Sequence, residues 1–220
     1  MEKKKTAALV SITINAVAPM IEYLRKHAPD FKVVNYLDGF LMEKVRLEGG
    51  IRDSSMRRMV DLIGRAAEDG ADGIIITCTV FTPYQPAFQK LFPVPVICAD
   101  AAMLDELSRQ PGRTAIICTF EGTVDTTRNG YFAYRRKNGM PEEVDMYTVP
   151  DAFRAAQVGD MAECDRIVRE KLLELDPQYE QIALAQISMI GAAEGLVLPH
   201  AKLYISPASA MEELLRRLES

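Results

Sequence analysis

The chain has no tryptophan, only two histidines among its 220 residues, and four cysteines. The cysteines, at positions 78, 98, 118 and 164, form no C-x-x-C pair and lie in no Cys/His cluster. Structural zinc sites and disulfide frameworks depend on such paired spacings. The sequence therefore predicts no metal site and no disulfide scaffold, and free thiols are typical of a cytoplasmic protein.

Long tracts of a single residue class are also missing. The 26 basic and 31 acidic residues are spread along the chain, and none of the basic tracts that follow a phosphate backbone is present. No stretch approaches the roughly 18 apolar residues that span a bilayer. The apolar run near the N-terminus is interrupted by Ser11, Thr13 and Asn15, which favours a strand over a signal peptide. We therefore expect no nucleic-acid partner and no membrane partner.

What the sequence does contain is an alternation of short apolar segments with longer amphipathic ones, within a composition that is 48% hydrophobic. This alternation is typical of a parallel sheet with crossover helices. The pattern predicts strands at about 6–12, 32–36, 73–77, 94–98, 114–118, 144–148, 181–185 and 203–206. It predicts helices over 18–27, 54–68, 101–109, 127–138, 161–175 and 208–218.

The second half of the chain repeats the first at a constant offset of 108 residues. Three segment pairs share this offset: 6–11 with 114–119, 74–78 with 182–186, and 102–103 with 210–211. A shared offset over separated segments favours a duplication into halves 1–108 and 109–220, with the last helix able to cross back onto the first half. Equivalent residues of two such halves would face one another across a cleft, and Cys78 and Gln186 are one such pair.

Cys78 is the strongest catalytic candidate. It directly follows the apolar segment 73–77 and precedes Pro83, which is suited to beginning a helix. A sulfur near a helix N-terminus is stabilised as the thiolate, which can act as a base on a carbon-bound proton next to a carboxylate. The alternative interpretation is a buried core cysteine, and we apply it to Cys98 and Cys164.

Small hydroxyl and amide side chains gather at the predicted strand ends. They include Thr13 and Asn15 in the first half and Thr119 and Thr123 in the second. Short donors of this kind suit a carboxylate ligand, although each alone is equally typical of turns and helix caps. The phosphate-binding loops G-x-x-x-x-G-K-[ST] and G-x-G-x-x-G are absent.

Several segments resemble the aspartate/glutamate/hydantoin racemase superfamily, and together they extend over nearly the whole chain. Asp72-Gly-Ile-Ile-Ile-Thr-Cys-Thr79 is similar to the first cysteine motif of that superfamily, and Cys118-Thr-Phe-Glu-Gly-Thr123 is similar to its second-half turn. The segments 35–39, 99–103 and 184–189 resemble one branch of it.

The resemblance implies two flavodoxin-like α/β halves, each with a mainly parallel four-stranded sheet flanked by helices, and a cofactor-independent isomerase. In such racemases two cysteines on opposite faces of the substrate remove and return the α-proton. Here Gln186 occupies the place of the second cysteine and cannot exchange a proton. We therefore expect Cys78 to act as acid and base on a small carboxylic or amino acid, and we also expect a homo-oligomer.

The resemblance also assigns the other site residues. Thr79 and the second-half threonines Thr119 and Thr123 would hold the substrate carboxylate, and Gln186 with Ser188 would hydrogen-bond the intermediate. Three alternatives stay open: Cys118 as a second acid, a single-cysteine decarboxylase, lyase or cis-trans isomerase, and a protein that senses a small acid without catalysis.

Overall fold

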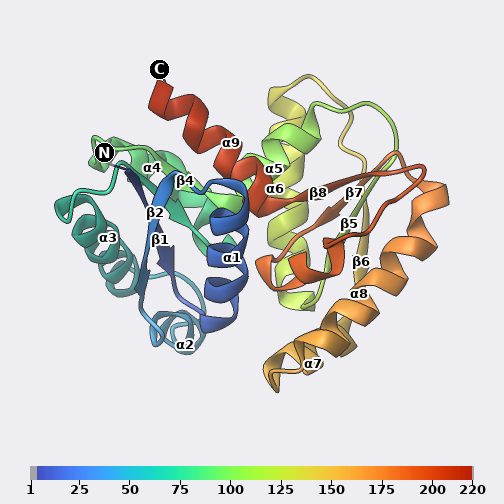
Figure 1. Ribbon diagram of the computed structural model, residues 1–220, viewed down its shortest axis with the longest axis horizontal. Helices are drawn as coiled ribbons and strands as arrows, with labels where there is room; N and C mark the ends of the chain where they lie inside the picture. The colour runs from blue at the N-terminus through green and yellow to red at the C-terminus, as the bar shows by residue number, and fades with distance from the viewer. Residues whose placement is uncertain (1–3, 220) are drawn as a thin grey trace. The chain divides into compact units, whose positions relative to one another are not determined.

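The computed structural model describes residues 4–219, in which helices flank two separate parallel sheets (Figure 1). The contacts divide the chain into two units, one running up to Ala99 and resuming at Ala210, the other being Asp100–Ser209. Residues 100–108 thus group with the second unit, whereas the repeat placed the boundary after residue 108. No helix between residues 4 and 219 has the length and apolar character needed to cross a membrane.

The first unit is built on a four-stranded sheet in the order β2-β1-β3-β4, with every pairing parallel. Every residue of the central strand β3 is buried, as expected for an apolar strand covered on both faces. The strands are β1 (Lys5–Ser11), β2 (Phe31–Leu37), β3 (Gly73–Ile76) and β4 (Val96–Cys98). The helices are α1 (Val17–His27), α2 (Leu41–Leu47), α3 (Asp53–Glu68) and α4 (Gln85–Leu91).

The second unit repeats this topology, with the strand order β6-β5-β7-β8 and every pairing parallel. Its strands are β5 (Thr114–Cys118), β6 (Asp145–Thr148), β7 (Gln181–Leu184) and β8 (Lys202–Ile205). Its helices are α5 (Ala99–Ser108), α6 (Val124–Lys137), α7 (Pro150–Gln157) and α8 (Met161–Leu175). The predicted α/β class with two similar four-stranded parallel sheets is confirmed. Periodicity alone did not mark α2, α4 and α7, because seven or eight residues give only two turns of pattern, although Pro83 had indicated a helical segment after Cys78.

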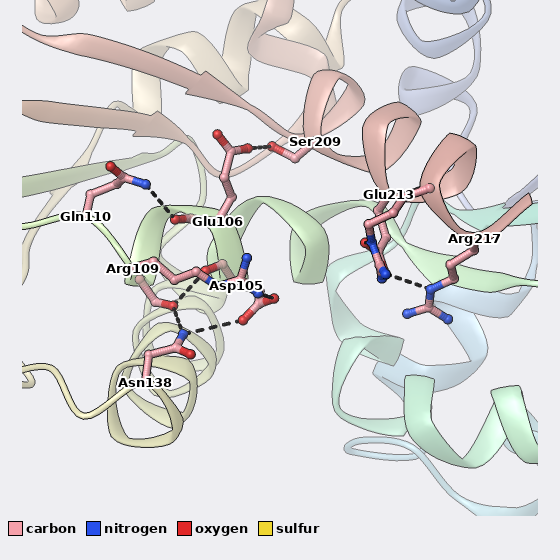
Figure 2. A network of polar contacts seen from close by, with 10 residues as sticks. Asp105, Glu106, Arg109, Gln110, Asn138, Ser209, Glu213 and Arg217 are labelled. Carbon is pink, nitrogen blue, oxygen red and sulfur yellow. Dashed lines mark hydrogen bonds and ion pairs between the residues drawn. The ribbon is translucent and has the colours of Figure 1, made fainter. Parts of the chain in front are cut away.

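The last helix, α9 (Ser206–Glu219), contributes to both units along its length. Ser209 donates a hydrogen bond to Glu106 of α5 at 2.7 Å, within the second unit (Figure 2). Further along, Arg217 donates to Gln89 of α4 at 2.8 Å, within the first unit. Leu214 packs so closely on Gly73 that an added Cβ there would lie 2.2 Å from the Leu214 methyl carbon. The glycine at the start of β3 therefore allows α9 to pack on the first sheet.

The hydrogen-bond ladders correct the predicted offset for one pair of strands. The N–H of Thr77 donates to Val10 O (3.1 Å), and that of Ala185 donates to Ile117 O (2.9 Å). Thr77 and Ala185 differ by 108 residues, but Val10 and Ile117 differ by 107. The first strand of the second unit is therefore shifted by one residue, and Cys118 is equivalent to Ser11 rather than to Val10. Cys78 and Gln186 remain equivalent.

Candidate functional site

Polar side chains of the first unit gather at the carboxyl ends of its central strands. Thr77 donates a hydrogen bond from its hydroxyl to Ser11 Oγ at 3.0 Å, and Ser11 Oγ donates to Asn35 Oδ1 at 3.0 Å. This chain of hydrogen bonds runs across β3, β1 and β2, and the Ser11 side chain is fully buried. It fixes the end of β3 immediately before Cys78.

Cys78 lies where β3 ends and the 3₁₀ helix η2 (Thr79–Tyr84) begins. Its backbone is still extended, with φ −117° and ψ 120°, and its carbonyl accepts the N–H of Phe81 at 3.3 Å. The residue is 7% exposed, whereas the other three cysteines are 0% exposed. Thr79, the next residue, is half-buried. The predicted position at a strand end before a helical turn matches the structure.

The turn after β1 holds the other two predicted residues of this unit. Thr13 precedes the short 3₁₀ helix η1 (Ile14–Ala16), and its side chain makes no capping hydrogen bond there. Thr13 is half-buried and Asn15 is exposed. Because β1 and β3 are neighbouring parallel strands, this turn and Cys78 lie at the same edge of the sheet.

An ion pair at this edge was not predicted from the sequence. Asp38, just after β2, accepts two hydrogen bonds of 2.7 Å from the guanidinium of Arg58 in α3. The guanidinium lies 5.7 Å from the centre of the Phe40 ring. No sequence pattern distinguishes Arg58, because a charged residue on an amphipathic helix looks like any solvated side chain.

Gln186 holds the corresponding position in the second unit, between β7 and the 3₁₀ helix η5 (Ile187–Ala193). Its Oε1 accepts the backbone N–H of Thr119 at 2.8 Å and lies 3.4 Å from the hydroxyl of Thr119. Its Nε2 donates to Thr123 Oγ1 at 2.9 Å, and Thr123 in turn donates to Phe120 O at 2.7 Å. The structure thus joins three predicted site residues, with the amide of Gln186 fixed against the turn after β5.

Cys118 lies beneath this arrangement at the end of β5. Burial raises the pKa of its thiol, and hydrogen bonds with Gln186, Thr123 and Thr127 oppose that rise. The residue is 0% exposed, so a substrate at the surface of the unit has no direct access to its sulfur. Ser188, the remaining predicted residue, is half-buried within η5.

Between residues 4 and 219, no group of three or more His, Cys, Asp or Glu side chains is placed so that it could hold a metal ion. The first unit offers a slightly exposed thiol, hydroxyl groups and the Asp38–Arg58 ion pair at the carboxyl ends of its strands, and the second unit offers hydroxyl groups and one fixed amide.

The exposure of the cysteines predicts an order of chemical labelling. We expect iodoacetamide to alkylate Cys78 in the native protein roughly tenfold faster than Cys98, Cys118 or Cys164. Cys78 alone among the four has measurable exposure, and burial raises the pKa of Cys164 to about 11. Peptide mass spectrometry over a time course measures the four rates. Equal rates at Cys78 and Cys164 would identify Cys78 as a core residue.

Comparisons with known proteins identify one family and a fold shared with solved structures. Residues 12–211 match the family model described as Asp/Glu/Hydantoin racemase. Among solved structures, aspartate racemase from Picrophilus torridus is similar with a TM-score of 0.72 at 12% identity, covering 98% of this chain and 94% of that one. Allantoin racemase from Klebsiella pneumoniae has a TM-score of 0.71 at 16% identity, with coverages of 96% and 86%. Glutamate racemase from Thermus thermophilus has a TM-score of 0.62 at 17% identity, with coverages of 98% and 81%. No curated protein matches the chain.

Proposed function

The chain belongs to the Asp/Glu/hydantoin racemase family and is a racemase-type enzyme, and we propose that it acts without a cofactor at the α-carbon of a small carboxylic or amino acid. In this proposal Cys78 is the residue that exchanges the α-proton. The main support for this proposal is that two equivalent positions in the two units carry different residues, a cysteine in one and a glutamine in the other. Cys78 precedes η2 in one unit, and Gln186 precedes η5 in the other.

The proposed step begins with the Cys78 thiolate. Its sulfur takes the proton from the α-carbon, the C–H bond breaks, and the electron pair moves into the substrate carboxylate to give an enediolate. The S–H formed in this step then returns the proton to carbon. Thr13, Asn15 and Thr79 lie at the same sheet edge and supply short hydrogen-bond donors for the carboxylate oxygens.

Gln186 has a different part in the proposal. A carboxamide does not exchange protons at neutral pH, so it cannot replace the second cysteine of a two-cysteine racemase. Its oxygen and one N–H are engaged by Thr119 and Thr123. We propose that Gln186, Thr119 and Thr123 form a fixed set of hydrogen-bonding groups, together with Ser188. This set binds the intermediate and supplies no proton.

A one-face mechanism predicts that α-hydrogen exchange outpaces inversion of the centre. We expect the protein in deuterium oxide to exchange the α-hydrogen of its substrate at least about tenfold faster than it inverts the α-carbon, because Cys78 returns the deuteron to the face it left. The two enantiomers of aspartate and of glutamate, together with allantoin, form the first panel, with proton NMR measuring exchange and chiral chromatography measuring inversion. Gln186→Cys should raise the ratio of inversion to exchange. Inversion as fast as exchange in the unaltered protein would exclude the one-face mechanism.

The same asymmetry favours a second candidate, a decarboxylase in which Cys78 protonates a planar intermediate from one side. Substituted malonates would then lose carbon dioxide, and the product would be a single enantiomer whose new hydrogen comes from solvent through Cys78. Formation of the racemic product would argue against this candidate. A protein that only senses a small acid would bind members of either panel without turnover, and Cys78→Ala would leave that binding intact.

A further inference from the structure

A carboxylate that the proposed chemistry does not use lies directly under the segment that carries Gln186 and Ser188. Asp165 belongs to α8, and its carboxyl group packs closely against Gly191 in η5. An added Cβ at Gly191 would lie 2.3 Å from Asp165 Oδ2 and 2.7 Å from both Cγ and Oδ1. The Asp165 carboxylate can lie this close to the backbone of η5 only because residue 191 has no side chain. The contact therefore depends on both the glycine and the aspartate.

Asp165 also holds the backbone of η5. Burial raises the pKa of Asp165, and this effect outweighs the positive charge of Arg169 and the hydrogen bond that the N–H of Ala192 donates to the carboxylate, both of which lower the pKa. One turn further along α8, Arg169 donates to the carbonyl of Glu194 at 2.8 Å. Two residues spaced by one helical turn therefore hold the carboxyl-terminal end of η5 from below.

The amino-terminal end of η5 is fixed from the other side by the hydrogen bonds of Gln186 with Thr119 and Thr123. In the first unit, the equivalent 3₁₀ helix η2 continues directly into helix α4, which holds its carboxyl-terminal end. In the second unit no helix of the described chain intervenes between η5 and β8, so the segment depends on contacts with α8 and with the turn after β5.

The stability of the fold alone does not explain why an aspartate occupies position 165. Its Oδ1 is buried and has no hydrogen-bond partner among the described residues. The side chain as a whole is half-buried, but a buried carboxylate oxygen without a partner is unfavourable, and an apolar residue at this position would avoid that penalty. Such a residue under a proposed site is better explained by what it holds in place.

We propose that Asp165 is a positioning residue that fixes η5, and through η5 fixes Gln186 and Ser188 for the reaction proposed above. It acts by accepting the Ala192 N–H while lying on Gly191. The role of Asp165 in catalysis rests on the proposed function, whereas its role in holding η5 in place does not. The two can therefore be tested separately.

The structural test is amide hydrogen exchange over residues 186–196, measured by mass spectrometry on the full chain. Asp165→Leu should raise exchange in this segment about tenfold or more, because both the hydrogen bond and the contact with Gly191 are lost. Asp165→Asn keeps an acceptor oxygen and should stay within about threefold of the unaltered protein. Gly191→Ala displaces the carboxylate from the opposite side and should resemble Asp165→Leu. Arg166→Gln, at an exposed neighbouring position of α8, is the matched control and should change nothing.

The catalytic test separates positioning from general destabilisation. A destabilised enzyme loses active molecules and shows a lower kcat with KM unchanged, whereas a displaced Gln186 and Ser188 should raise KM for the exchanged substrate about tenfold. Asp165→Asn should restore KM. Unchanged exchange over 186–196 in Asp165→Leu and Gly191→Ala would overturn the proposal, and so would an Asp165→Asn variant that behaves like the leucine variant. If η5 loosens as expected but Cys78→Ala keeps full activity, the proposed function fails and the positioning role stands.

Discussion

Replacing Cys78 with alanine is expected to abolish α-hydrogen exchange, with a loss of about 10³-fold or more in kcat/KM. The methyl group cannot accept or return a proton, and the other three cysteines are 0% exposed. Cys78→Ser should retain a small residual rate, since a hydroxyl is a far weaker acid than a thiol. The measurement is deuterium incorporation at the α-carbon of whichever member of the substrate panel the unaltered protein exchanges.

Cys98→Ala is the matched control for the loss of a cysteine. Cys98 ends β4, the strand next to β3, and it is fully buried. Its replacement removes a sulfur of the same sheet without touching the proposed chemistry, so exchange should stay within a factor of a few of the unaltered protein. Both variants should cost about 1 kcal/mol in unfolding free energy. Full activity in Cys78→Ala, or equal losses in both variants, would contradict the assignment of Cys78.

Replacing Arg135 with methionine is expected to lower the free energy of unfolding by about 3 to 5 kcal/mol. Arg135 of α6 is only 4% exposed, and its guanidinium donates to three backbone carbonyls. These are Pro141 O at 2.7 Å, Gln110 O at 2.8 Å and Ser108 O at 3.1 Å. Ser108 is the last residue of α5 and Gln110 follows two residues later, so the guanidinium also lies where a positive charge interacts favourably with the helix dipole. Methionine fills the space but leaves these carbonyls without their donors.

The adjacent residue provides the control for this variant. Arg136 is exposed and pairs with Glu142 at the surface, so Arg136→Met should cost no more than about 0.5 kcal/mol. Arg135→Lys should fall between the two, since one ammonium group cannot reach all three carbonyls in the fixed geometry of a guanidinium. Urea unfolding followed by circular dichroism measures the differences. A similar cost for Arg135→Met and Arg136→Met would show that the carbonyl contacts contribute little.

Local sequence patterns were sufficient to predict the architecture of the chain. The alternation of apolar segments and amphipathic helices determines a parallel α/β fold, because each strand of such a sheet must be apolar on both faces and each helix on one. The same patterns located Cys78 at a strand end, since β3 is a continuous apolar run that ends there. The motif around Cys78 also indicates the family, which the family model confirms, while the similar solved structures share the fold.

Contacts between distant residues were decided only by the tertiary structure. A sequence offset cannot detect a one-residue shift between strands, so the hydrogen-bond ladder was needed to show that Cys118 corresponds to Ser11. No local pattern marks Arg135 as buried or Asp165 as lying on Gly191, because these charged residues belong to helices whose other charges face solvent. The pairing of Gln186 with Thr119 and Thr123 likewise joins residues more than 60 positions apart. Sequence periodicity determines which face of an element is buried, whereas the partners of a buried polar group depend on how separate elements pack together.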